Sequence, residues 1–97
     1  MDSLLIEIFS IDSKLLSGNV NSAIFPGSDG SFQILKNHAP IVSTLKKGEI
    51  IIDGEISLED NTSKDLYDIE KDKKKISLNI ESGLVEMKRN SIKVLIN

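Results

Sequence analysis

The sequence contains no cysteine, which excludes disulfide bonds, thiolate nucleophiles and thiolate metal sites. The opening residues carry two acidic side chains, Asp2 and Glu7, and no basic cluster, so we do not expect a secretory signal there. No apolar run approaches the roughly 20 residues that a membrane-spanning helix needs. The net charge of −3 does not supply the cationic surface that binding along a nucleic acid requires. We therefore expect a soluble, mildly acidic protein.

A helical pattern is also missing, since no apolar stripe at i, i+3, i+4 and i+7 is sustained across twelve residues. Apolar and polar residues instead alternate in several segments, which predicts strands with one buried and one solvated face. Isoleucine, whose β-branched side chain suits a pleated surface, occurs fifteen times. The apolar faces predicted in this way are Leu4, Ile6 and Ile8; Ile56 and Leu58; Ile76, Leu78 and Ile80; and Ile92, Val94 and Ile96.

Turn residues interrupt these segments about every eight to twelve residues, a spacing that favours an antiparallel β-sandwich or flattened barrel. We predict an all-β fold of about ten strands in a single domain over residues 1–97. The strands are predicted near 3–9, 14–17, 20–25, 31–35, 41–45, 49–52, 55–59, 75–80, 84–88 and 92–96. Turns are predicted at Ser17-Gly18-Asn19, Pro40, Gly48, Asp53-Gly54 and Gly83, among others.

A charged segment breaks the alternation, since eleven of the seventeen residues from Glu59 to Lys75 are charged. One interpretation is a solvated hairpin or loop, an insertion over about 53–75, whose lysines discourage edge-to-edge strand pairing. The other is an arm that binds a partner through Leu66, Tyr67 and Ile69. The sequence leaves both open.

The stretch from Ala23 to Gly48 holds the only histidine and both prolines, and its Gly-x-x-Gly element raises the question of phosphate binding. A phosphate-binding loop needs a lysine and a hydroxyl residue after its glycines, followed by a helix. Here Ser31, Phe32 and Gln33 follow and read as a strand. A tight turn formed by Pro26 and the two glycines is the better interpretation.

Candidate catalytic groups are few. A catalytic or metal-bound imidazole needs further ligands or a nucleophile, and the sequence neighbours of His38 supply neither. The carboxylates Asp53, Glu55, Glu59 and Asp60 lack the spacing of a calcium loop. We expect no catalytic residue, no metal site and no cofactor.

Residues Leu15 to Ile50 resemble the N-terminal β-sandwich domain of the epsilon chain of F-type ATP synthase. The family pattern contains a Leu-Ser-Gly element, a Pro-Gly-x-x-Gly element, a His-Ala-Pro element and a Leu-Lys-x-Gly element. Matching positions are Leu16-Ser17-Gly18, Val20, Pro26-Gly27, Gly30, Phe32, Ile34, His38-Ala39-Pro40, Leu45-Lys46 and Gly48, followed by Gly83, Leu84, Val85, Glu86, Ile92 and Val94. The ordered set at these spacings makes the resemblance specific.

The resemblance implies a non-catalytic rotor subunit in the central stalk of a proton-translocating synthase, working during ATP synthesis. One side would pack on the gamma chain and one end would rest on the c-ring, at the cytoplasmic face of a bacterial inner membrane, without insertion into it. The ring-facing residues implied by the match are Pro26, Gly27, Ser28, Asp29, Gly30, Ser31, Phe32 and His38.

Many relatives continue into a two-helix hairpin that restrains ATP hydrolysis and in some cases binds ATP. Because this sequence stops at Asn97, we expect neither epsilon-based inhibition nor a nucleotide site. The alternative function is a free-standing β-sandwich that binds a small molecule or peptide. A rotor subunit should expose a sizeable apolar face, whereas a ligand-binding module should show a concave pocket with convergent polar groups. A small hydrolase would need a second titratable group near His38.

Overall fold

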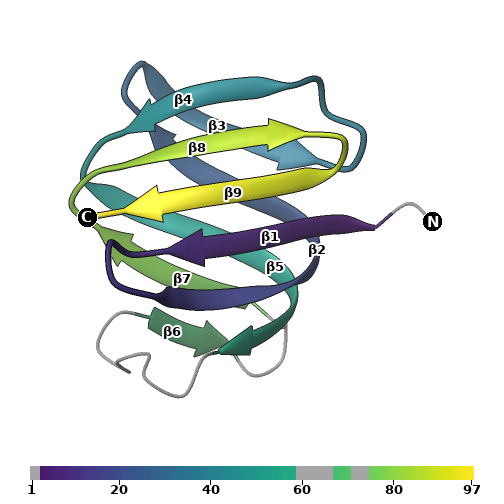
Figure 1. Ribbon diagram of the computed structural model, residues 1–97, viewed down its shortest axis with the longest axis horizontal. Coiled ribbons are helices and arrows are strands. Elements are labelled where there is room, and N and C mark those ends of the chain that lie inside the picture. The colour runs from purple at the N-terminus through teal and green to yellow at the C-terminus, as the bar shows by residue number, and fades with distance from the viewer. Residues whose placement is uncertain (1–2, 59–66, 71–74) are drawn as a thin grey trace.

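The computed structural model describes residues 3–58, 67–70 and 75–97, and all regular structure in these ranges is β-strand (Figure 1). The predicted all-β fold is confirmed. The strands are β1 (Leu4–Phe9), β2 (Lys14–Gly27), β3 (Gly30–Leu35), β4 (Ile41–Leu45), β5 (Gly48–Leu58), β6 (Tyr67–Glu70), β7 (Lys75–Ile80), β8 (Gly83–Lys88) and β9 (Ser91–Ile96). No helix in the described ranges could span a membrane.

The described residues form nine strands where the sequence predicted about ten, and the difference lies in β2 and β5. Gly18 was predicted at a turn but lies inside β2, which runs unbroken from Lys14 to Gly27. The predicted turn at Asp53-Gly54 likewise lies inside β5. Two predicted pairs of strands are therefore two long strands, and β6 is an additional one.

Long strands are possible here because β2 and β5 bend together. The pairing register shifts between Val20 and Ser22 of β2, opposite Gly54 and Asp53 of β5. Such a β-bulge increases local twist and lets a strand curve around a core. At Gly54, a Cβ atom would lie only 2.5 Å from the Cα atom of Val20, and φ is +155°. The glycine therefore serves close backbone approach within a strand and not a chain reversal.

The strands form one continuous curved sheet in the order β1-β9-β8-β4-β2-β5-β7-β6, with β3 beside β2 and β1 pairing with β2 as well. Figure 1 shows β4, β8, β9 and β1 side by side in front, with β5, β7 and part of β2 behind them. The described pairs are antiparallel except β1 with β9, which is parallel.

The core lies between the two layers and consists of apolar side chains from all the long strands. The alternation predicted for β1, β7 and β9 is confirmed, since each of its inward residues is at most 5% exposed. The side chains of Ile56 and Leu58 lie outside the described residues. Phe25 is fully buried, and its ring stacks on that of Phe32 at 5.6 Å between centroids. The largest fully buried side chains are Phe25, Leu4, Ile6, Ile8, Leu16, Ile34, Ile50, Ile52, Leu78, Met87, Ile92 and Val85.

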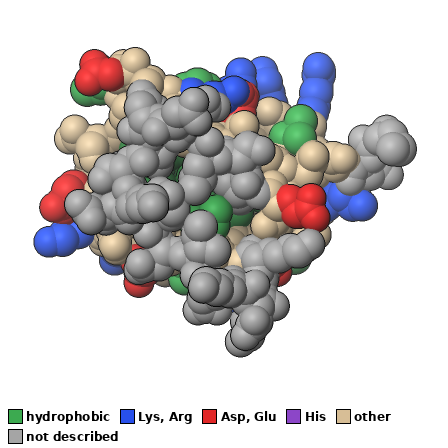
Figure 2. Space-filling view, turned by 90° about the horizontal axis from the view of Figure 1, so that it is seen from below, with side chains coloured by type: hydrophobic (Ala, Val, Ile, Leu, Met, Phe, Trp, Pro, Cys, Tyr) green, Lys and Arg blue, Asp and Glu red, His purple; other side chains and the backbone are tan. Residues whose placement is uncertain are grey.

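The charged segment is described only in part. Tyr67–Glu70 forms β6 and pairs antiparallel with β7, with Tyr67 opposite Leu78 and Glu70 opposite Lys75. Leu66 and the side chains of Tyr67 and Ile69 lie outside the described residues, so the arm remains a prediction. In the view from below, the described part of the surface shows charged side chains of both signs around its margin and apolar atoms in small separate areas (Figure 2).

Replacing Gly54 by alanine tests the close approach of β2 and β5. The added Cβ would meet the Val20 Cα atom at 2.5 Å and the Asn19 carbonyl oxygen at 2.8 Å, both backbone atoms that cannot move alone. We expect Gly54→Ala to lower the free energy of unfolding by about 2–4 kcal/mol in urea titrations. Asn79→Ala, at an exposed position of β7, should change it by less than about 0.5 kcal/mol. Equal values for the two variants would contradict this account.

Candidate functional site

The turn between β2 and β3 is a two-residue hairpin made of Ser28 and Asp29. Gly27 and Gly30 are paired at its base. A Cβ on Gly27 would lie 2.6 Å from the carbonyl oxygen of Gly30 and 2.8 Å from the Phe32 ring, and Gly30 has φ of +130°. The two glycines are therefore required by the shape of the turn.

Hydrogen bonds fix this turn to the end of β4. The Ser28 backbone N–H donates to the carbonyl oxygen of Thr44 at 3.0 Å, and the hydroxyl groups of Ser28 and Thr44 lie 2.8 Å apart. The backbone N–H of Lys46 donates to the carbonyl oxygen of Pro26 at 2.9 Å. The turn is thus fixed to the end of β4 by bonds at Pro26 and Ser28 and is a preformed element.

The predicted ring-facing residues differ in exposure. Pro26 and Gly27 are buried, so they shape the turn and do not present a surface themselves. Phe32 is half-buried against the core. The exposed residues of the set are Ser28, Asp29, Gly30 and Ser31.

The structure does not bring His38 next to this turn. The turn lies at the start of β3, whereas His38 follows its end (Figure 1). Five residue steps of extended chain separate the two ends of β3, roughly 17 Å. His38 lies instead near the β8–β9 turn, because Asn37 accepts and donates hydrogen bonds with the side chain of Asn90 at 3.0 and 2.6 Å.

The hydrogen bond of the His38 side chain goes to the backbone. Its Nδ1 atom lies 2.6 Å from the carbonyl oxygen of Ala39, the next residue. In the described ranges, no three His, Cys, Asp or Glu residues come together in a way that could hold a metal ion. Of the other predicted turn residues, Gly48 and Gly83 begin β5 and β8, and Pro40 precedes β4.

The outer face of the front layer carries an apolar row that the alternating pattern does not predict. Leu84 of β8 lies opposite Leu95 of β9, and Leu95 lies opposite Phe9 of β1. Leu84 is 43% exposed, Leu95 is 48% exposed, and Ile11, just beyond β1, is 82% exposed. We call Phe9, Ile11, Leu84 and Leu95 the outer apolar row.

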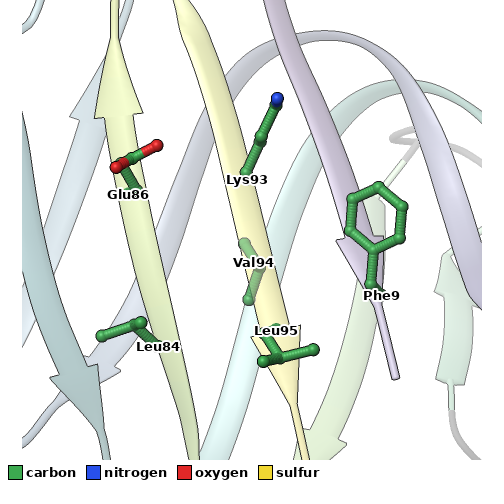
Figure 3. A pocket seen from close by; sticks show the side chains of 6 residues that line it. All are labelled: Phe9, Leu84, Glu86, Lys93, Val94 and Leu95. Atoms are coloured by element: carbon green, nitrogen blue, oxygen red, sulfur yellow. The ribbon is translucent and has the colours of Figure 1, made fainter. Parts of the chain in front are cut away.

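The outer apolar row borders two open hollows. One, of about 230 Å³, is lined by Phe9, Leu84 and Leu95 together with Glu86 and Lys93 (Figure 3). The other, of about 390 Å³, is lined by Ile11, Leu84 and Leu95 and extends to Thr44. Both are mostly apolar and open to solvent, which is a shape suited to a protruding side chain of another protein.

A charged row runs beside the outer apolar row, two residue positions away on each of the three strands. Glu86 lies opposite Lys93, and Lys93 lies opposite Glu7. The Nζ atom of Lys14 is 3.2 Å from the Oε2 atom of Glu7. Opposite charges in neighbouring strands stabilise the sheet only slightly at the surface, but they make this part of the face polar.

The sequence does contain a trace of the outer apolar row. Alternation requires polar neighbours, yet Leu84-Val85 and Val94-Leu95-Ile96 are consecutive apolar residues within strands. Such runs place apolar side chains on both faces of a sheet. Reading them as a second apolar face would have predicted Leu84 and Leu95 at the surface.

By fold, the chain is a mostly antiparallel β-sandwich protein whose described strands surround one core. A comparison with solved structures agrees. A chain of the Euglena gracilis mitochondrial ATP synthase, in a structure of OSCP, F1 and c-ring, superposes with a TM-score of 0.73 at 13% identity, over 99% of this chain and 51% of that chain. A chain of the Tetrahymena thermophila mitochondrial ATP synthase, in a structure of the central stalk and c-ring, superposes with a TM-score of 0.63 at 12% identity. The match covers 95% of this chain and 61% of that chain.

Sequence comparisons identify the family. The model of the ATP synthase delta/epsilon chain β-sandwich domain matches residues 3–64. The ATP synthase epsilon chain of Leptospira interrogans (serovar copenhageni) is 37% identical over 94 residues, which cover 97% of this chain and 61% of the relative. The ATP synthase epsilon chain of Chlorobium limicola is 42% identical over 65 residues, which cover 67% of this chain and 68% of the relative. The chain belongs to the delta/epsilon chain family of ATP synthase, and it spans about three fifths of the length of the Leptospira relative.

Replacing Thr44 by valine tests the anchoring of the turn. Valine keeps the shape of threonine but loses the hydroxyl group that faces Ser28 at 2.8 Å. We expect Thr44→Val to lower the free energy of unfolding by about 0.5–1.5 kcal/mol and to speed hydrogen exchange in the turn. Thr44→Ser retains the hydroxyl and should leave exchange in the turn unchanged. Equal exchange rates in both variants would show that the hydroxyl pair does not hold the turn.

Proposed function

We propose that this chain is a non-catalytic rotor subunit of a proton-translocating F-type ATP synthase, linking the gamma chain to the c-ring during ATP synthesis. Membership of the delta/epsilon family supports this, as do relatives named ATP synthase epsilon chain. In this proposal residues 1–97 act as one β-sandwich domain. The chain works peripherally, at the cytoplasmic face of a bacterial inner membrane.

The observation that carries the proposal is the outer apolar row, which we assign to the gamma chain. Leucine side chains that are close to half exposed on a rigid sheet gain free energy when a partner covers them. The charged row beside them supplies the polar border that is typical of protein interfaces. The open hollows have apolar linings with few polar groups, so a small-molecule binding module is less well supported.

The β2–β3 turn is assigned to the c-ring. Ser28, Asp29 and Ser31 are exposed and can meet amide or charged groups of the ring. The turn is preformed by its glycines and by the bonds to Thr44 and Lys46, so it loses little conformational entropy on docking. His38 lies beyond the other end of β3, so a contact of His38 with the ring would be separate from the contact of the turn.

Replacing Leu84 by glutamate tests the assignment of the outer apolar row. A buried carboxylate without a partner is costly, so we expect Leu84→Glu to lower recovery of gamma by at least about tenfold when the tagged chain is pulled from membranes. Leu35→Glu is the matched control, because Leu35 is 52% exposed and lies on β3, away from the row. Equal recovery of gamma with both variants would remove the row from the gamma interface.

Replacing Gly30 by valine tests the turn. A Cβ at Gly30 meets nothing within 4 Å, so the cost comes from its φ of +130°, about 1–3 kcal/mol. We expect the variant to remain folded in thermal melts but to recover less c subunit, because the turn changes shape. Asn79→Val, a substitution at an exposed position of β7, should recover both partners normally. Undiminished recovery of gamma and c by Gly30→Val would remove the turn from the interface.

A further inference from the structure

Strand β3 has one side without a strand neighbour in the described structure. It pairs with β2 alone, from Gly27 opposite Gly30 to Ser22 opposite Leu35. In a two-residue hairpin the pair at the base is hydrogen-bonded, and such pairs then alternate with non-hydrogen-bonded pairs. The backbone groups of Gly30, Phe32 and Ile34 therefore point toward β2.

It follows that the N–H and C=O groups of Ser31 and Gln33 and the N–H of Leu35 point to the open side of β3. The Leu35 carbonyl already accepts the backbone N–H of His38 at 3.1 Å. The position of Pro26 agrees with this pattern, since proline has no N–H and lies opposite Ser31, in a non-hydrogen-bonded pair. The nearby edge of β4 is different, because its Thr44 carbonyl accepts the N–H of Ser28.

The open side of β3 lacks the features by which proteins usually block edge pairing. From Gly30 to Leu35 there is no charged residue and no proline. The side chains of Ser31, Gln33 and Leu35 are exposed, and Leu35 is 52% exposed. An uncharged edge of this kind is a template for another strand.

The charges at the two ends of β3 indicate which strand could pair with its open side. Asp29 stands just before the strand and Lys36 just after it, and both are exposed. When two copies of β3 pair antiparallel, the start of each lies beside the end of the other. With Gln33 opposite Gln33, Asp29 of one copy lies opposite Asn37 of the second, one position from Lys36, at both ends.

We propose that the free chain self-associates through β3, with the two strands antiparallel about a twofold axis. Gln33 lies opposite Gln33 of the second copy, and Ser31 lies opposite Leu35. This register keeps the inner faces of both copies on the same side. It joins the two Gln33 residues in a hydrogen-bonded pair and lets each Leu35 N–H donate to the Ser31 carbonyl of the second copy.

The self-paired form is expected to be weak. One six-residue strand pair buries less than the roughly 1,200 Å² of a stable interface, so association should become visible between about 0.1 and 1 mM. Asp29 and Ser31 also belong to the turn assigned to the c-ring, so the dimer would be a form of the unassembled chain; this last step alone rests on the proposed function.

Sedimentation velocity of the purified chain from about 20 µM to 1 mM tests the proposal. Asp29→Lys and Lys36→Asp should each weaken association by about tenfold, because each reversal turns two attractive pairs into repulsive ones. The double variant with both reversals should restore it. Glu86→Lys, a reversal on the outer face, is the matched control and should have no effect. At high concentration, amide exchange should slow at Gln33 and Leu35.

Several results would overturn the proposal. A chain that stays monomeric at every concentration would do so. Association that survives both single reversals but is lost in Leu84→Glu would place the contact on the outer apolar row. Failure of the double variant to restore association would exclude the antiparallel pairing. None of these outcomes bears on recovery of gamma or c subunits, so the proposed function is tested separately.

Discussion

Strand β2 is shared by the two layers, and the rest of the fold depends on its pairing with β5. Its first half lies between β1 and β5, its second half lies beside β3, and its last residue reaches Leu45 of β4. A strand of fourteen residues can serve both layers only if it curves. The register shift at Val20 and the missing side chain of Gly54 provide this curve, and the residues beyond it, such as Phe25, point into the same core.

Alternation in the sequence was enough to predict β1, β7 and β9 and their buried faces, because a two-residue period leaves few alternatives when one side is solvated. The predictions were wrong where glycine stood among polar residues. Gly18 and Gly54 read as turns locally, yet both lie inside long strands. Whether a glycine reverses the chain or allows a neighbour to approach depends on residues far away in sequence, here Asn19 and Val20 for Gly54.

The candidate site could likewise be predicted only in part from the sequence. The tight turn after β2 followed from Pro26 and its two glycines, which act within a few residues of one another. Its fixation by Thr44 could not be predicted, because that contact joins residues sixteen positions apart. The separation of the turn from His38 also required the structure, since nearness in sequence conceals that β3 runs between them. The surface position of Leu84 and Leu95 could be predicted only if consecutive apolar residues are taken to mean that both faces of the strand are apolar.

The two proposed interfaces are physically continuous. Ser28 of the turn is bonded to Thr44, Thr44 lies opposite Leu84, Leu84 lies opposite Leu95, and Leu95 lies opposite Phe9. This line crosses four neighbouring strands at one end of the sandwich, without an intervening flexible loop. A load applied at the turn would therefore reach the outer apolar row through a short path of inter-strand hydrogen bonds. A subunit that turns with its neighbours needs such a path, because any hinge between its two contact surfaces would absorb the rotation instead of passing it on.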